Sequence, residues 1–233
     1  MVVTVAAAAV SATAASVATP EIDLLVSSCP KPSTITFNKS VPDQQPFPKT
    51  SVSLCYTKGA LKLGFTAYGE SSFYVNQTQT TNDDIWAYEV MEAFVSSGND
   101  DPSTYLEFEV NPFNITYQAF VYNPSKVRAP GTPFDHFFIN DPVTDGFTAK
   151  TTITPDQSNP KNQVWHSDVV IPLALFNADR NSAHDLAGSL WRMNFFRTIT
   201  NETYYPNQHL GAWRVPDTPS FHITPKFGHV MFV

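Results

Sequence analysis

Positive charge is scarce in this sequence: 14 Lys and Arg residues stand against 21 Asp and Glu residues, which gives a formal net charge of −7. A chain with this balance repels phosphate backbones, so we do not expect nucleic acid among its partners. Long apolar runs are also missing. Because no segment has the length and apolar character of a membrane-spanning helix, we expect no membrane partner either. These shortages favour neutral ligands or cations.

Familiar catalytic patterns are absent as well. The chain has no G-x-S-x-G pattern, no H-E-x-x-H pattern and no Cys–His arrangement. Its histidines do not have the spacing of metal ligands and are scattered along the chain: His136, His166, His184, His209, His222 and His229. The sequence therefore predicts a binding protein rather than an enzyme.

Cysteine is almost lacking, and the two that occur are Cys29 and Cys55. An even cysteine count in an exported chain suggests one disulfide bond. Closing a loop of roughly 25 residues would stabilise the fold by about 3 kcal/mol, by restricting the unfolded chain. The alternative is a pair of buried free thiols.

The first 18 residues are uncharged, rich in Ala and Val, and end in the small residues that a signal peptidase prefers. The segment is too short and too rich in Ala for a stable membrane span, although it lacks the usual basic start. We expect residues 1–18 to be a signal peptide and the protein to be secreted. Four N-x-[ST] sequons are candidate glycosylation sites on this route: Asn38, Asn76, Asn114 and Asn201.

Hydrophobic and aromatic residues are plentiful. They make up 42% of the chain and include 18 Phe, 9 Tyr and 4 Trp, enough for a large aromatic core. The 19 Pro residues argue against long helices, because each removes a backbone donor and fixes φ. We therefore predict a single all-β domain over residues 19–233, with the antiparallel β-sandwich architecture of jelly-roll-like proteins.

Short β-prone runs separated by turn residues support this fold class and predict about ten strands. These are residues 51–56, 60–67, 87–97, 104–110, 115–122, 147–153, 164–175, 190–200, 211–215 and 229–233. We expect a long surface loop over the Pro- and Gly-rich residues 123–146, and one short helix within residues 177–188. A helix over residues 88–94 is the alternative to a strand there, but the neighbouring turns favour the strand.

Some large side chains have a simple structural interpretation. Trp165 and Trp191 lie within apolar runs and are expected in the core, while Trp213 is expected in the core or at its rim. The residues predicted to be buried between the two sheets are Phe65, Phe94, Phe108, Val110, Ile171 and Phe195.

Several motifs resemble, in the same order, those of the family 9 carbohydrate-binding modules. They comprise Trp86 to Phe94, Glu107-Phe108-Glu109-Val110-Asn111, Trp165 to Pro172, Trp191 to Arg197, and Trp213…Phe221-His222…Pro225-Lys226-Phe227-Gly228. The resemblance covers most of residues 20–233. It implies a secreted β-sandwich of stand-alone, fungal type that binds a carbohydrate without cutting it.

The resemblance also implies a site in which two aromatic rings hold a terminal sugar of a cell-wall polysaccharide. Aromatic rings pack on the apolar faces of a sugar, while carboxylates and amides bind its hydroxyl groups. Residues at the matching positions are Trp86, Glu92, Glu107, Glu109, Asn111 and Phe221. Phe221 replaces the usual Trp, and Glu109 replaces the usual Arg. Asn111 precedes a proline and has a second interpretation as a turn residue. We expect the chain to be a monomer.

Two other functions remain open from the sequence. A glycoside hydrolase would use Glu92 and Glu107 as its pair of carboxyl groups. An electron-transfer sandwich would hold haem between a Met and a His, for which the candidates are Met91, Met193, His166 and His222.

A structural calcium ion is a further expectation from the resemblance, because family 9 modules often hold one. Hard oxygen ligands are available in the predicted loops at Asp83, Asp84, Asp100 and Asp101. No continuous calcium-binding loop is present in the sequence.

Overall fold

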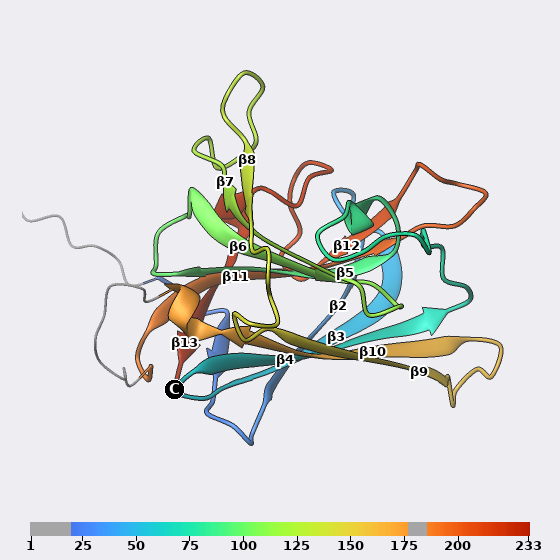
Figure 1. Ribbon diagram of the computed structural model, residues 1–233, viewed down its shortest axis with the longest axis horizontal. Helices are drawn as coiled ribbons and strands as arrows, with labels where there is room; N and C mark the ends of the chain where they lie inside the picture. Colours follow the sequence, from blue (N-terminus) through green and yellow to red (C-terminus); the bar gives the residue numbers. More distant parts are fainter. Residues whose placement is uncertain (1–19, 177–185) are drawn as a thin grey trace, which may run out of the picture.

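The computed structural model describes residues 20–176 and 186–233, and in it two β-sheets pack face to face (Figure 1). The predicted fold class, an all-β antiparallel sandwich, is confirmed. The expected signal peptide lies outside the described residues, as does most of the segment 177–188 that was expected to hold a helix.

The first sheet has eight strands, and every neighbouring pair in it is antiparallel except β1 with β13. Its strands, in spatial order, are β1 (Leu24–Val26), β13 (Gly228–Phe232), β11 (Leu190–Ile199), β5 (Val90–Ser97), β6 (Thr104–Val110), β7 (Thr116–Tyr122) and β8 (Asp135–Phe138), with β12 (His209–Ala212) paired to β11. The central strands β11, β5 and β6 have almost no exposed side chains, because both faces of this sheet are covered.

The second sheet is fully antiparallel and one of its faces is open to solvent. Its strands, in order, are β2 (Ser33–Lys39), β3 (Pro46–Tyr56), β4 (Ala60–Glu70), β10 (Gln163–Pro172) and β9 (Thr148–Pro155). Burial alternates along β3, as expected for a strand with one face on the core.

Three short 3₁₀ helices complete the described structure: η1 (Ile85–Ala87), η2 (Leu173–Phe176) and η3 (Thr224–Lys226). None of the helices in residues 20–176 and 186–233 has the length and apolar character to cross a lipid bilayer.

Most predicted strands agree with the structure to within a few residues, and residues 104–110 agree from end to end. β1, β2 and β8 were not predicted, and β8 lies within the expected loop 123–146. The strand expected from residue 87 begins instead at Val90. The preceding turn is a 3₁₀ helix, closed by a hydrogen bond from the Tyr88 N–H to the Ile85 carbonyl (3.0 Å).

The main core lies between the sheets and includes Trp165 and Trp191, which are buried as predicted. Trp213 is partly buried against the same core. Five of the six residues predicted between the sheets are found there, but Phe94 is not. It is buried on the outer face of the first sheet, because the alternation along β5 turns it away from Met91, Ala93 and Val95.

A second apolar cluster covers that outer face. It joins side chains of β5, β6, β7 and β11 to one residue between β2 and β3 and to residues near the end of the chain. Its members are Val41, Phe94, Tyr105, Val121, Phe196, Ala212, Phe221 and Phe227. The covering explains how glutamates on the outer face of a sheet become buried. It also creates the walls of the candidate site.

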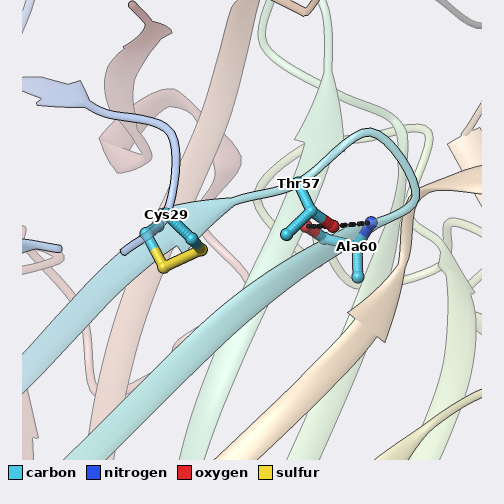
Figure 2. The surroundings of a disulfide bond; sticks show 4 residues. Cys29, Thr57 and Ala60 are labelled. Carbon is cyan, nitrogen blue, oxygen red and sulfur yellow. Dashed lines mark hydrogen bonds between the residues drawn. A yellow bond between two sulfur atoms is a disulfide. The ribbon is translucent and has the colours of Figure 1, made fainter. Parts of the chain in front are cut away.

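The predicted disulfide between Cys29 and Cys55 is present and ties the segment after β1 to the end of β3 (Figure 2). The adjacent turn into β4 is closed by hydrogen bonds between Thr57 and Ala60, which Figure 2 also shows. The same segment is bonded to β3 through its backbone, since the Cys29 N–H donates to the Tyr56 carbonyl (2.9 Å). The bridge therefore reinforces a docked segment.

We expect the double variant Cys29→Ser/Cys55→Ser to lose about 3 kcal/mol of unfolding free energy, because the bridge closes a long loop in the unfolded chain. Urea denaturation of the two proteins measures this difference. A midpoint and slope equal to those of the wild type would show that the backbone bonds alone hold the segment.

Candidate functional site

A cleft of about 550 Å³ opens on the outer face of the first sheet. It is bounded by η1, by β8 and the loop before it, and by residues 208–222 near the end of the chain. Its lining residues are Asp84, Trp86, Glu92, Glu107, Tyr117, Arg128, Phe134, Asp135, His136, Phe138, Thr198, Gln208, Leu210, Pro219, Ser220, Phe221 and His222.

Carboxyl groups from two neighbouring strands lie at the floor of this cleft. Glu92 on β5 is directly paired with Glu109 on β6. Glu107 precedes Glu109 by two residues and therefore lies on the same face of β6. One oxygen from each of the three carboxyl groups lies within 4.8 Å of the other two. All three residues are at most 4% exposed. We call Glu92, Glu107 and Glu109 the carboxylate cluster.

Burial and mutual repulsion control the charge of this cluster. Burial raises the pKa of Glu92 well above its usual range, and the nearby charge of Glu107 raises it further. The pKa of Glu109 is raised for the same reasons, by burial first and then by the charges of Glu92 and Glu107. Within the described residues, no hydrogen-bond donor reaches either oxygen of Glu109. Without a counterion, burial and repulsion therefore favour the protonated forms of Glu92 and Glu109.

Two imidazole rings lie beside the cluster. The Nε2 atoms of His136 and His222 are 3.4 Å and 3.8 Å from oxygens of Glu107. The Nδ1 atom of His222 forms a hydrogen bond with the Tyr105 hydroxyl (2.7 Å), which fixes the ring. Burial lowers the pKa of His222 to about 4, so the ring is neutral near pH 7.

The two aromatic residues predicted to hold a sugar line the same cleft but differ in exposure. Trp86 is 48% exposed and lies in η1. Its indole Nε1 donates to Asp84 Oδ1 (3.2 Å), and its carbonyl accepts a hydrogen bond from Gln208 Nε2 (2.7 Å). Phe221 is only 8% exposed, because its ring stacks on Phe196 at 4.1 Å between centroids. Trp86 thus offers far more free ring surface than Phe221.

The other predicted site residues divide into two groups. Glu92 and Glu107 line the cleft, and Glu109 lies behind them as part of the cluster. Asn111 does not line the cleft. Its side-chain oxygen accepts hydrogen bonds from the backbone N–H groups of Phe113 (3.0 Å) and Ile115 (2.9 Å), as expected for a turn residue.

Sequence reasoning did not find several residues that complete the cleft. His136 was hidden in the predicted loop, although it lies on β8. His222 follows Phe221 directly in the sequence, which was an available local signal. Arg128 contributes a guanidinium, which lies over the Phe134 ring at 4.4 Å from its centroid.

The aspartates expected to bind calcium are not gathered into one site. Asp83 accepts hydrogen bonds from the backbone N–H and hydroxyl of Thr80, and Asp101 pairs with Arg192 (2.7 Å). Among residues 20–176 and 186–233, the group of three side chains with metal-binding geometry is the carboxylate cluster.

The candidate haem ligands lie in three different parts of the sandwich. Met91 and Met193 are buried between the two sheets, whereas His222 lines the cleft on the outer face. His166 is bound to Thr66 and Asp168 on the outer face of the second sheet. The geometry therefore brings no Met–His pair of this set together.

The four glycosylation candidates differ in exposure. Asn38 and Asn114 are exposed, while Asn76 and Asn201 are half-buried. The side-chain oxygens of Asn76 and Asn201 accept hydrogen bonds from nearby backbone N–H groups. Their modification remains a prediction.

Solved structures share this architecture. A proposed carbohydrate-binding protein of Bacteroides uniformis has a TM-score of 0.63 and 18% identity, with 90% of this chain and 99% of that one covered. The family 9 carbohydrate-binding module of Caldicellulosiruptor kristjanssonii has TM-scores of 0.55 with cellotriose and 0.53 with glucose, at 12% identity. Those matches cover 90% of this chain and 92% and 95% of the module's chains. At these identities the similarity is one of fold.

Sequence comparison gives a much nearer relative. No model of a known protein family matches the chain. A protein of Arthroderma benhamiae named as an extracellular protein is 56% identical over 205 residues, which cover 88% of both chains. The chain therefore belongs to the same family as this extracellular protein of Arthroderma benhamiae.

Proposed function

We propose that this protein binds carbohydrate and that a terminal sugar occupies the cleft above the carboxylate cluster. The observation that carries the proposal is the combination, in one cleft, of the half-exposed Trp86 ring with the carboxyl groups of Glu92 and Glu107. A flat ring suits the apolar face of a sugar, and carboxyl groups suit its hydroxyl rim. The shared fold with carbohydrate-binding proteins supports the same function.

The proposal extends to where and how the protein acts. The relative's name supports secretion. We propose in addition that residues 1–18 are removed as a signal peptide. We propose that the mature chain acts alone as a fungal-type, non-catalytic monomer, and that its ligand is a cell-wall polysaccharide. The Phe221 ring offers the cleft less stacking surface than a Trp would, so Trp86 provides most of the stacking with the sugar.

Binding fits the carboxylate geometry better than hydrolysis does. In a glycoside hydrolase one carboxyl group protonates the leaving oxygen while the second acts at the sugar carbon, so the two flank the bond. Here Glu92 and Glu107 project from adjacent strands of one sheet and face the cleft from one side, with Glu109 behind them. Such a floor can bind several hydroxyl groups at once.

Replacing Trp86 with alanine should weaken carbohydrate binding by about 1–3 kcal/mol, because the sugar loses its main stacking surface. The ligand is first identified on a glycan array that carries mono- and oligosaccharides from cellulose, xylan and chitin. Calorimetry with the best ligand then compares wild type and variant. Because Trp86 is 48% exposed, its loss should leave the melting temperature nearly unchanged.

Phe113→Ala is the matched control, since this ring is 54% exposed and does not line the cleft. It should bind the same sugar as tightly as the wild type. Equal affinity of wild type and Trp86→Ala would place the binding site elsewhere. If the protein binds no glycan on the array, the proposed function as a whole is wrong.

A further inference from the structure

The carboxylate cluster has the dimensions of a cation site. One oxygen from each of Glu92, Glu107 and Glu109 lies within 4.8 Å of the others. Oxygen atoms on opposite sides of a calcium ion are roughly 4.6–5.2 Å apart, because each Ca–O distance is about 2.3–2.6 Å. The three oxygens can therefore contact one ion with small movements of their side chains.

A second observation points to a missing partner for these groups. Both oxygens of Glu109 are buried, and no hydrogen-bond donor of the described residues reaches them. Glu107 Oε2 is also buried and forms no hydrogen bond within the described residues, although His136 Nε2 lies 3.4 Å away. Buried carboxyl oxygens are almost always paired in folded proteins, so orphaned ones require another explanation, such as a bound ion. These oxygens belong to the groups that face one another in the cluster.

The charged side chains around the cleft do not supply that partner. Asp84 and Asp135 add further negative charge to its walls. Among the described residues that line the cleft, Arg128 is the one Lys or Arg, and its guanidinium stacks on Phe134. It makes no ion pair with the carboxylate cluster. The field at the cleft floor therefore favours a small cation from solution.

We propose that the carboxylate cluster binds a hard divalent cation, such as Ca²⁺ or Mn²⁺, at the floor of the cleft. Three carboxylates are ligands that such ions prefer. Glu92 and Glu107 line the open cleft, so the ion reaches them from solvent, and Glu109 closes the site from behind. His136 and His222 stand beside Glu107, where their Nε2 atoms can join the coordination of Mn²⁺.

An ion in this position has one side turned toward the cleft. Ligand oxygens can occupy its remaining coordination positions, and vicinal sugar hydroxyls are suitable donors. This consequence rests on the proposed carbohydrate function. The cation site itself does not, because it depends only on the geometry of the three carboxyl groups.

Calorimetric titration of the chelator-treated full-length protein with calcium chloride and with manganese chloride tests the site. We expect one ion per chain to bind at neutral pH and to raise the melting temperature. Glu109→Gln and Glu92→Gln each keep the side-chain shape and remove one charge. Each should weaken ion binding by at least roughly tenfold. The two variants also guard against a folding defect in either one.

Asp168→Asn is the control, because this carboxylate is 72% exposed and lies on the outer face of the second sheet. It should bind the ion as the wild type does. The proposal is overturned if neither ion binds to the wild type, or if both glutamine variants bind as tightly as the wild type. A sugar titration with and without chelator tests the consequence separately. If the chelator does not change the affinity for the sugar, only the proposed coordination of sugar hydroxyls by the ion is wrong.

Discussion

Replacing Arg197 with methionine should destabilise the protein by about 3–5 kcal/mol, the usual result of removing one partner of a buried ion pair. Arg197 is fully buried between the sheets and pairs with Glu70, which is 2% exposed. Its guanidinium also donates to the carbonyls of Lys49 (3.3 Å) and Tyr68 (3.2 Å). Methionine fills similar space but leaves the Glu70 carboxylate and both carbonyls without this donor.

Arg214→Met provides the matched comparison. Arg214 is also paired, with Asp23 at 3.1 Å, but its side chain is 52% exposed. Surface pairs of this kind contribute about 1 kcal/mol or less. Denaturant unfolding at neutral pH measures both variants, and equal losses in the two would contradict the structural role assigned to Arg197.

The strand pattern was readable from the sequence where turn residues marked both ends of a long β-prone run. Residues 104–110 are an example, with an Asp-Pro turn before the strand and Asn111-Pro112 after it. β8 has turn residues near both ends, but it is only four residues long and lies in a segment so rich in Pro and Gly that the whole segment was predicted as a loop. It is a strand because it pairs with β7, through contacts such as Phe120 with Phe137. Such long-range pairing leaves no local signal.

The part of the site that depends on the alternation of side chains along one strand was predictable from the sequence. Alternation places Glu107 and Glu109 on one face of β6, which the sequence indicated. Glu92 joins them only through the register of β5 against β6. His136 and His222 come from distant parts of the chain and meet Glu107 only in the folded protein.

The burial of outward-facing residues was not predictable at all. A strand sequence shows that Phe94 and Glu92 share a face, but not that a later segment covers that face. Phe94 is buried there against residues that include Phe221 and Phe227. The same covering desolvates the carboxylate cluster. Expecting solvent-facing glutamates, as is usual for a sheet surface, therefore gives the wrong environment at Glu92.

Glu89→Gln should remove part of the pH dependence of stability that the wild type shows above neutral pH. Burial first, and then the neighbouring Glu70 carboxylate, raise the pKa of Glu89 to about 10 against the opposing effect of Arg197. The unfolded value is about 4.5, so the folded protein keeps a proton that the unfolded chain loses. The stabilisation that this proton provides is fully present below the unfolded value of 4.5 and is lost as the pH rises toward 10.

Between about pH 7 and 9, one such proton lowers the unfolding free energy by up to about 3 kcal/mol. Glutamine carries no proton to lose, so the variant should have a shallower slope when urea unfolding is repeated across this range. His222 does not contribute there, because its lowered pKa leaves it neutral in both states. Glu202→Gln, at an exposed position, should keep the slope of the wild type. Equal slopes for Glu89→Gln and wild type would mean that Glu89 is ionised in the folded protein and that Arg197 neutralises both of its neighbouring carboxylates.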